Sequence, residues 1–397
     1  MFTIEKNDSK GVPILVWLES PEQLDEECLR QATNLSNLPF AYQHIALMAD
    51  AHKGYGMPIG GLLAAKEAVI PNAVGVDIGC GVVFTETNWA VEEIDEKILK
   101  SLVRGIMERI PTGFEKHKKK KKCRALDLFS PQESPSDNLK KEIAEGYYQV
   151  GTLGGGNHFI ELQSDDKGKL CIMIHSGSRN FGFKVAQHFN RLAKKLNEKK
   201  YTGVPKSYDL AYLPAASTEG KDYLLWMNLA LDFAAENRTA MLEVVKEEAR
   251  KECSGIKFGK IVNAHHNYAS QEEHYGEKVW VHRKGAIKTA EGELGIIPGA
   301  MGAKSYIVKG LGNDKSFCSS PHGAGRRLGR KEAVRTINIE ETINDLKSKG
   351  IILGKRKKKD VSEESRFAYK DIDWVIDQSA DLAVPIKALN TLAVVKG

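Results

Sequence analysis

The 397-residue sequence lacks any apolar run that approaches the length needed to span a membrane. Its first residues, MFTIEKNDSKG, contain no apolar core of a secretory signal. Its six cysteines are scattered, and their spacing is not that of a disulfide framework. From these absences we expect a cytoplasmic protein with free thiols and no membrane partner.

Two common nucleotide-binding signatures are also missing. There is no Walker A sequence and no strand–GxGxxG–helix unit, so neither of those nucleotide folds is supported. Solenoid-type repeats and long Pro/Ser-rich linkers are absent as well. The polar residues of interest run from Asp50 to His322, so they must converge from across the chain. We therefore predict a single large α/β (α+β) domain over residues 1–397, with mixed sheets around a central cleft.

The positive charge of the chain is concentrated in two places. Hydrophobic residues make up 42% and charged residues 28% of a chain with a formal net charge of +6, a composition typical of a globular protein. Residues 116–122 read KHKKKKK and residues 355–359 read KRKKK. Such runs attract polyanions such as nucleic acid, although a solvated loop without a partner has the same composition. We expect residues 113–137 and 354–362 to form mobile basic or polar loops.

Helix and strand signals frame the polar segments. Ser20-Pro21-Glu22-Gln23 is a capping box, which predicts a helix to about Ser36, and apolar spacing predicts another over Val91–Ile110. A turn is expected at residues 7–11. The apolar runs Gln43–Met48, Lys169–His175 and Lys260–Tyr268 read as strands that end in polar, Gly- or Asn-containing segments.

Asp77 and Cys80 lie in a Gly-rich segment, Gly75–Gly81, with glycines at positions 75, 79 and 81. A carboxylate and a thiolate three residues apart can face one divalent metal over a tight glycine turn. A buried strand end with a structural cysteine would give the same local sequence.

Three histidines complete the candidate metal set. His158, His175 and His266 each end an apolar run at a turn, as strand-borne ligands do. Any one of them alone would more often be a satisfied core or surface residue. Mixed carboxylate, thiolate and imidazole donors suit Mn²⁺, Zn²⁺, Co²⁺ or Fe²⁺ better than Mg²⁺, and a shared Cys or Asp could bridge two metals.

His322 differs from the other histidines because its neighbours in HGAGR are small. A neutral imidazole is a competent nucleophile toward phosphorus, and the nearby Arg326 could stabilise phosphate oxygens. A fifth metal ligand or a capping role is the alternative. Glycine clusters at 154–156, 299–302 and 323–325 would permit close approach of phosphate, although each is also compatible with an ordinary tight turn.

Eight segments together resemble the RtcB-type RNA-splicing ligases, in the right order from about Asp50 to Gly397. They are GYGMPIGG, GVDIGCG, GGGNHFIEL, HSGSRNFG, HHNYA, PGAMGAKSY, HGAGR and the terminal VVKG. The resemblance implies a GTP- and Mn²⁺-dependent ligase with an RtcB-like fold. It would join RNA ending in a 2′,3′-cyclic phosphate or 3′-phosphate to RNA ending in a 5′-hydroxyl, in RNA repair or tRNA splicing. An archease-type activator is a further expected partner.

The resemblance also implies residue roles. His322 would be the catalytic nucleophile that takes GMP, and Cys80 would bridge two Mn²⁺ ions held with Asp77, His158, His175 and His266. The residues that would hold the guanylate are Asn157, His158, Phe159, Glu161, His266, Asn267, Pro298, Gly299, Ala300, Met301, Ser305, His322, Gly323, Ala324, Gly325, Tyr369 and Lys396. Ala300 stands where the family commonly has Ser.

Other residues are expected near the RNA. Arg179, Arg238 and Arg326 are candidates for RNA or phosphate contacts, and Asp50 or His52 for orienting the water that opens a cyclic phosphate. Glu161 could accept from guanine N1 and N2, which adenine cannot match. The alternatives are a metal-dependent RNA cyclic phosphodiesterase that does not ligate, which would not need His322, and a non-catalytic RNA-binding protein with a structural metal.

Overall fold

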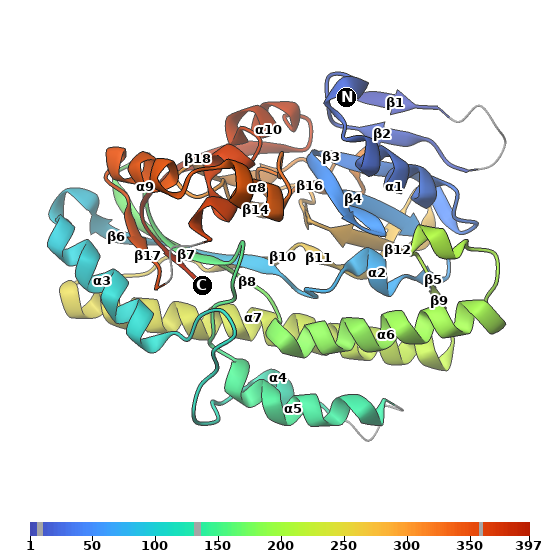
Figure 1. The fold of residues 1–397 in the computed structure, drawn as a ribbon, viewed down its shortest axis with the longest axis horizontal. Helices are drawn as coiled ribbons and strands as arrows, with labels where there is room; N and C mark the ends of the chain where they lie inside the picture. The colour runs from blue at the N-terminus through green and yellow to red at the C-terminus, as the bar shows by residue number, and fades with distance from the viewer. Residues whose placement is uncertain (6–10, 131–135, 357–359) are drawn as a thin grey trace.

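Two mixed β-sheets and a layer of long helices make up the fold, which confirms the predicted α/β (α+β) class (Figure 1). The computed structural model describes residues 1–5, 11–130, 136–356 and 360–397. Within these ranges, no helix combines the length and the apolar character that crossing a bilayer requires.

The first sheet has six strands and carries the N-terminal part of the chain. In spatial order they are β1 (Phe2–Ile4), β2 (Ile14–Val16), β3 (Ala41–Tyr55), β4 (Met57–Ala65), β12 (Glu277–Lys284) and β11 (Asn267–His274). Only β2 and β3 pair in parallel. Helix α1 (Glu26–Ser36) packs on β3 and β4, and Asp25 caps it by accepting from the Cys28 amide at 2.9 Å.

The second sheet has eight strands and includes the C-terminus. Seven follow in the order β10 (Val262–His265), β6 (Gly81–Ala90), β8 (Lys169–Ser176), β7 (Phe159–Asp165), β18 (Ala383–Lys396), β15 (Ser305–Gly310) and β14 (Leu294–Ile297). The eighth, β17 (Ile352–Gly354), pairs in parallel with β18. Two small pairs complete the strands, β13 (Ala286–Lys288) with β16 (Ser319–Pro321) and β5 (Ala68–Val69) with β9 (Leu213–Pro214).

Helices α6 (Arg179–Lys199) and α7 (Thr218–Glu252) run side by side beneath the sheets, and α4 (Arg124–Leu128) and α5 (Asp137–Gln149) form a further layer below them (Figure 1). Helix α3 (Glu96–Arg109) buries Leu99, Leu102, Val103 and Ile106, one stripe at helical spacing. The shorter helices are α2 (Pro71–Val74), α8 (Arg330–Thr336), α9 (Ile339–Ser348) and α10 (Ile372–Gln378).

The two faces of the second sheet carry different kinds of side chain. On β8, Leu170, Ile172 and Ile174 pack into a core cluster with residues of α3 and α7. Cys171 and Met173 point to the other face, and so does His175 because strand residues alternate. On β7 the same alternation puts Phe159, Glu161 and Gln163 on that second face. The polar side chains therefore gather on the face turned away from the long helices.

Several predicted boundaries differ from the observed ones. A 3₁₀ turn at Pro21–Gln23 precedes α1, and another at Val91–Glu93 precedes α3, because Asp25 and Asp95 supply the actual helix caps. The predicted strand over Lys260–Tyr268 is two strands, β10 and β11, which belong to different sheets. The predicted loop over 113–137 contains α4, and that over 354–362 contains the end of β17. Most of the turn at 7–11, residues 131–135 and Lys357–Lys359 lie outside the described residues.

Candidate metal and nucleotide site

Asp77 and Cys80 are presented by a tight turn between α2 and β6. Gly75 ends α2 with a φ of +95°, a conformation that L side chains rarely adopt. The Cys80 amide donates to the carbonyl of Asp77 at 3.1 Å, and the Gly79 amide donates to the carbonyl of Asn267 at 2.9 Å. The backbone thus turns both side chains toward the same space.

The three predicted histidines lie beside this turn. His158 Nε2 is 3.0 Å from Asp77 Oδ2 and 3.4 Å from the Cys80 sulfur. His175 Nε2 is 3.2 Å from the same sulfur and 3.4 Å from His266 Nε2. Segments from four parts of the sequence therefore place their donor atoms within one small volume.

His266 joins the two sheets. It is the single residue between β10, which pairs in the second sheet, and β11, which pairs in the first. Its amide donates to the Cys80 carbonyl at 2.8 Å, and its own carbonyl accepts from the Gly285 amide at 2.8 Å. The imidazole is consequently fixed where the two sheets meet.

These five side chains form two groups that share Cys80. One group is Asp77, Cys80 and His158, the other Cys80, His175 and His266, and within each group the donor atoms lie within 4.8 Å of one another. The donor set suits divalent cations of the Mn²⁺ or Zn²⁺ type. Because the Nε2 atoms of His175 and His266 face each other at 3.4 Å, their lone pairs oppose each other unless a proton or a cation lies between them. The residues present therefore fit two cations with a common sulfur ligand.

Burial controls the protonation of this cluster. It lowers the pKa of His158 and holds the pKa values of His175 and His266 well below the ordinary range, so these imidazoles stay neutral and able to bind a metal. Burial opposes ionisation of Asp77, but the hydrogen bonds with His158 and Cys80 and the nearby charges of His158 and Arg179 together outweigh it and bring the pKa of the carboxyl to about 2. Burial and the Asp77 charge raise the pKa of Cys80, so a cation would have to displace the thiol proton.

Arg238 of α7 lies beneath the cluster and is completely buried. Its guanidinium donates to the carbonyls of Gly79 and Ser176 at 2.8 and 2.9 Å and to Asn263 Oδ1 at 2.7 Å. The predicted contact of Arg238 with RNA or phosphate does not fit this position, because its donors are committed to protein oxygens and to His265 Nδ1. It braces the turns that carry Cys80 and His175.

Arg179 and Asn267 are also engaged at the cluster. Arg179 donates to the Gly113 carbonyl at 2.6 Å and to Thr152 Oγ1 at 3.1 Å, and its charge helps to lower the pKa of Asp77. Asn267 donates to the Asp77 carbonyl at 3.1 Å. The structure thus places Asn267 against the metal-group turn.

His322 follows β16 and faces the cluster from the side of the first sheet. Its ring centroid lies 4.7 Å from that of His266. Asp50 Oδ2, on the buried part of β3, accepts from the His322 amide at 3.1 Å and lies 2.7 Å from Nδ1. A carboxylate at Nδ1 places the ring proton there, which leaves Nε2 with a free lone pair. His52 Nδ1 lies 2.9 Å from the Asp50 carbonyl, so both residues predicted to orient a water adjoin His322.

Glycine is required three residues after His322. Gly325 has a φ of +73°, and a Cβ there would lie 2.2 Å from the Asp50 carbonyl oxygen. Any side chain would therefore push the His322 segment away from Asp50. At Gly323 a Cβ would lie 3.2 Å from the Pro298 carbonyl oxygen, so the segments 298–301 and 323–325 run close together.

Glu161 lies on the same face of β7 as the metal cluster and is almost fully buried. Its Oε2 accepts from Gln163 Nε2 at 2.6 Å and from Thr391 Oγ1 at 3.2 Å. Burial raises the pKa of Glu161 to about 7, against these hydrogen bonds, which favour the ionised form. Gln163 also donates to Ser305 Oγ at 3.2 Å, and Ser305 Oγ accepts from the Gly299 amide at 3.1 Å. One hydrogen-bonded chain therefore joins Glu161 to the predicted Pro298–Met301 turn.

A second polar group connects Tyr369, Arg326 and Lys396 through Glu364. The Tyr369 hydroxyl donates to Glu364 Oε2 at 2.7 Å, and the Lys396 ammonium lies 3.5 Å from that oxygen. Arg326 lies 3.2 Å from Glu364 Oε1 and 2.8 Å from the Tyr369 hydroxyl. Lys396 also lies 5.8 Å from the centre of the Phe159 ring, whose edge contacts His175. The predicted C-terminal residues thus lie next to β7.

The remaining predicted residues lie along the same region. The Asn157 carbonyl is 3.1 Å from His175 Nδ1, the position at which a metal-binding histidine usually donates. Ala300 and Ala324 are buried, and Met301 forms a β-bridge with Ser365. Ala300 supplies no side-chain hydrogen bond.

Three residues of this region had not been identified from the sequence: Gln163, Thr391 and Glu364. Gln163 could have been found, because it lies two residues after Glu161 on a strand and therefore on the same face. Thr391 lies on β18 opposite β7 in a register set by a bulge, and Glu364 lies in a 3₁₀ turn. No periodicity marks either of them.

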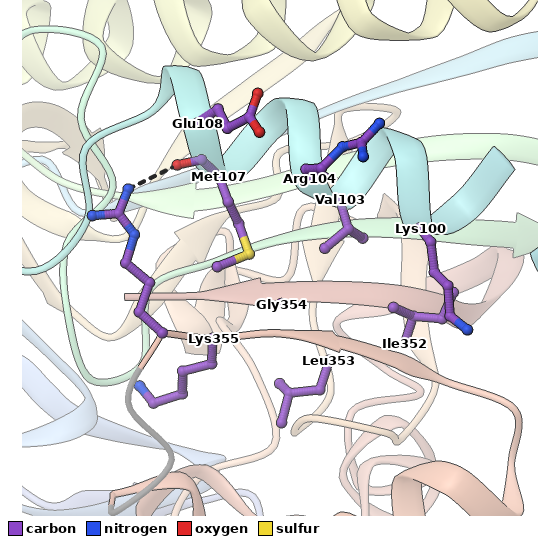
Figure 2. Close-up of a pocket in the computed structure, with 10 residues that line it drawn as sticks. Lys100, Val103, Arg104, Met107, Glu108, Ile352, Leu353, Gly354 and Lys355 are labelled. Atoms are coloured by element: carbon purple, nitrogen blue, oxygen red, sulfur yellow. Dashed lines mark hydrogen bonds between the residues drawn. The ribbon is translucent and has the colours of Figure 1, made fainter. Parts of the chain in front are cut away.

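A surface cleft of about 390 Å³ opens between α3 and β17, away from the ligands described above (Figure 2). Its basic residues include Lys100, Arg104 and Lys355, with Met107 and Leu353 between them. Arg356 lies at the edge of the cleft, where it donates to the Met107 carbonyl at 3.0 Å and pairs with Glu115. Among the described residues that line this cleft, none belongs to the predicted site, so its basic character is a separate surface feature.

Comparison with known proteins shows which family the chain resembles. The family model described as tRNA-splicing ligase RtcB matches residues 31–134 and 127–397. The chain is 36% identical to the RNA-splicing ligase RtcB of Escherichia coli (strain K12), over 98% of each chain. It is 32% identical to the tRNA-splicing ligase RtcB of Nanoarchaeum equitans, over 100% of this chain and 98% of the relative. It is 33% identical to the tRNA-splicing ligase RtcB of Thermococcus kodakarensis, over 94% of this chain and 91% of the relative.

Proposed function

Because the chain belongs to the RtcB family of RNA-splicing ligases, we propose that it is a GTP- and Mn²⁺-dependent ligase that works through a GMP-histidine intermediate. It joins RNA 2′,3′-cyclic phosphate or 3′-phosphate ends to 5′-hydroxyl ends, in RNA repair or tRNA splicing. The observation that carries this proposal is the position of His322, oriented by Asp50 and adjoining the two donor groups.

Asp77, Cys80 and His158 would hold one cation, and Cys80, His175 and His266 the other. Two bound cations supply neutralisation of phosphate charge and alignment of attacking and leaving oxygens. Arg238 and the Asn157 carbonyl hold the ligand-bearing segments in place. Preorganised ligands of this kind need little rearrangement when a cation enters.

His322 is the proposed nucleophile. With Asp50 at Nδ1, its Nε2 lone pair attacks the α-phosphorus of GTP, an N–P bond forms and pyrophosphate leaves. The RNA 3′-phosphate then takes GMP as the N–P bond breaks. Finally the 5′-hydroxyl attacks that activated phosphate, GMP leaves and a phosphodiester remains. Asp50 acts as a positioning residue, comparable in role to the carboxylate of a hydrolase triad.

Opening a cyclic phosphate requires a water molecule beforehand. His52 is the group we propose for orienting it, because burial lowers the pKa of this imidazole to about 4 and keeps it neutral at physiological pH. Its Nδ1 is committed to the Asp50 carbonyl, so its Nε2 is the atom available to the water.

Guanine selectivity is assigned to Glu161. An ionised carboxylate accepts from guanine N1 and N2, whereas adenine presents an acceptor at N1. Tyr369, Lys396, Ser305 and the Pro298–Met301 turn would surround the rest of the guanylate, with Phe159, Asn267 and Gly323–Gly325 beside the phosphates. Arg179 and Arg326 are proposed near RNA phosphates. A single ligase domain, a cytoplasmic location and an archease-type activator stay predictions.

The test is covalent labelling. The protein is incubated with Mn²⁺ and α-labelled GTP, and we expect acid-labile, hydroxylamine-sensitive label on the wild-type chain and none on His322→Ala. His188→Ala, at a half-buried histidine of α6, is the matched control and should label normally. Label on His322→Ala would overturn the assignment of His322 as the nucleophile. Absence of label on the wild type, with cyclic-phosphate hydrolysis retained in His322→Ala, would favour the phosphodiesterase.

A further inference from the structure

A third group of metal-type donors lies outside the site described above. Donor atoms of His274, Asp314 and Cys318 lie within 4.8 Å of one another. His274 is the last residue of β11, whereas His266 immediately precedes the first. Eight residues of extended chain separate the two histidines by roughly 27 Å. The group is therefore separate from the first metal cluster, and its proposed role does not depend on the proposed function.

The environment of His274 resembles that of a metal-binding histidine. Glu272 Oε2 lies 3.2 Å from His274 Nε2, and both side chains are buried. A carboxylate at one ring nitrogen fixes the proton there and presents the other nitrogen as a free lone pair. Glu272 is itself fixed, because Arg283 Nη2 lies 3.1 Å from the same oxygen. His274 thus has an oriented ring and a defined tautomer.

The other two donors come from one rigid turn. Asp314 begins a 3₁₀ turn, and Phe317 and Cys318 follow it with φ values of 49° and 50°. Two successive non-glycine residues in the left-handed region cost free energy, so the surroundings must hold them. The Cys318 amide donates to the Asn313 carbonyl at 2.9 Å, and Arg283 donates to the Phe317 carbonyl at 2.9 Å. Arg283 therefore fixes both the His274 side and the Cys318 side of the group.

We propose that His274, Asp314 and Cys318 bind a Zn²⁺ ion, with the fourth position open to water. One imidazole, one carboxylate and one thiolate are a zinc donor set. Donors around a tetrahedral Zn²⁺ lie roughly 3.5 Å apart, so an ion would draw donor atoms that lie within 4.8 Å of one another to that spacing. Asp314 is exposed and can make that movement, whereas the buried His274 stays in place.

The ion would hold the strand that carries the nucleophile. Cys318 directly precedes β16 and His322 directly follows it. A zinc ion that ties Cys318 to the end of β11 therefore anchors one end of the short strand whose other end meets Asp50. We expect zinc to stabilise this segment without taking part in ligation.

The test uses a chain without the Cys80 thiol, so that the first metal cluster cannot contribute a thiolate signal. In the full-length Cys80→Ala chain, Co²⁺ is added as a spectroscopic probe, and a thiolate-to-cobalt charge-transfer band in the near ultraviolet is expected. Adding Cys318→Ala should abolish the band. Adding Cys253→Ala, at another partly exposed free cysteine, should leave it unchanged. Asp314→Asn, an exposed change that spares the core, should weaken Zn²⁺ binding by about tenfold or more in a chelator competition.

Two results would overturn the zinc site. One is a Cys80→Ala chain that shows no thiolate band with Co²⁺ while circular dichroism shows it folded. The other is a band, or a Zn²⁺ affinity, that survives Cys318→Ala and Asp314→Asn unchanged. Neither result depends on GTP or RNA, so failure here and failure of the ligase proposal can be told apart.

Discussion

The candidate site has a metal half, made of Asp77, Cys80, His158, His175 and His266, and a nucleotide half around Glu161 and Glu364. The polar groups of the two halves find their partners in different ways. In the metal half, lone pairs face one another: His175 and His266 present Nε2 atoms 3.4 Å apart, beside the Cys80 sulfur. In the nucleotide half, polar groups pair among themselves: Glu161 with Gln163 and Thr391, and Glu364 with Tyr369 and Lys396. The first half holds donors that face one another across a space that a proton or a cation could occupy, whereas most polar groups of the second half already pair among themselves.

This difference has an energetic consequence. A cation entering the metal half meets donors whose desolvation occurred during folding, so binding them costs little additional ordering. A guanylate entering the nucleotide half must exchange existing hydrogen bonds for its own, and only the surplus contributes to affinity. We therefore expect substitutions in the metal half to have large effects and substitutions in the nucleotide half graded ones.

The largest effect is expected for Cys80→Ala. This change removes the one donor common to both groups. Both cations lose a ligand, and we expect guanylylation and ligation to fall by roughly a thousandfold or more, as for lost metal ions that stabilise a transition state. Initial rates with labelled GTP and bound Mn²⁺ per chain are the measurements. Cys171→Ala, at a buried cysteine of β8, is the control. Two retained Mn²⁺ ions per chain would contradict the shared role.

Asp50→Asn should have the next largest effect, at the boundary of the two halves. The amide can no longer hold the His322 proton on Nδ1 as a carboxylate does. Guanylylation should slow by about a hundredfold or more, as for the wrong tautomer in a catalytic triad, while bound Mn²⁺ stays the same. A fall in metal content equal to the fall in rate would mean that Asp50 only supports the fold.

Glu161→Gln tests the nucleotide half. Loss of the carboxylate should reduce the preference for GTP over ATP by about ten- to a hundredfold, measured as the ratio of kcat/KM values for labelling. The wild type should also show a pH dependence. Because the pKa of Glu161 is raised to about 7, the carboxyl is protonated below that pH and ionised above it. Apparent GTP affinity should therefore rise as pH increases through 7, and this rise should be absent in Glu161→Gln.

The smallest effect is expected for Thr391→Val, which removes one hydrogen bond to Glu161 with little change of shape. A hydrogen bond of about 1 kcal/mol corresponds to roughly a fivefold change. The pKa of Glu161 should rise further, so the KM for GTP at pH 7 should increase by that amount and the pH midpoint should move upward. Thr289→Val, at a buried threonine outside this network, provides the comparison. A midpoint that moves downward would show that Thr391 does not support the ionised form.

Local sequence signals were sufficient to name the five donor side chains that the structure brings together in the metal half. Asp77 and Cys80 lie in one turn, and each histidine lies at or beside a strand end: His158 directly before β7, His175 near the end of β8 and His266 directly after β10. Motif and position next to an apolar run therefore mark them without tertiary information, although His158 begins its strand and does not end one. The proximity of Asp50 to His322 could not be predicted, because 272 residues separate them and no pattern links them. The sequence also does not reveal that Arg238 is buried. A positive charge on a helix suggests a nucleic-acid contact until the carbonyls of Gly79 and Ser176 are seen around it.

The fold shows the same division. The stripe of α3 and the alternation of β7 and β8 follow from hydrophobic periodicity. The change of sheet at His266 does not, because β10 and β11 read as one continuous strand and only their partners, β6 and β12, differ. Strand pairing between distant segments depends on tertiary packing that a local pattern does not contain.

That change of sheet sets how the chain can vary in length. With one residue between β10 and β11, an inserted or deleted amino acid at positions 265–267 would either invert the facing of every side chain in β11 or withdraw the imidazole from its neighbours. Viable descendants of this sequence should therefore accumulate length differences elsewhere and keep this three-residue spacing fixed.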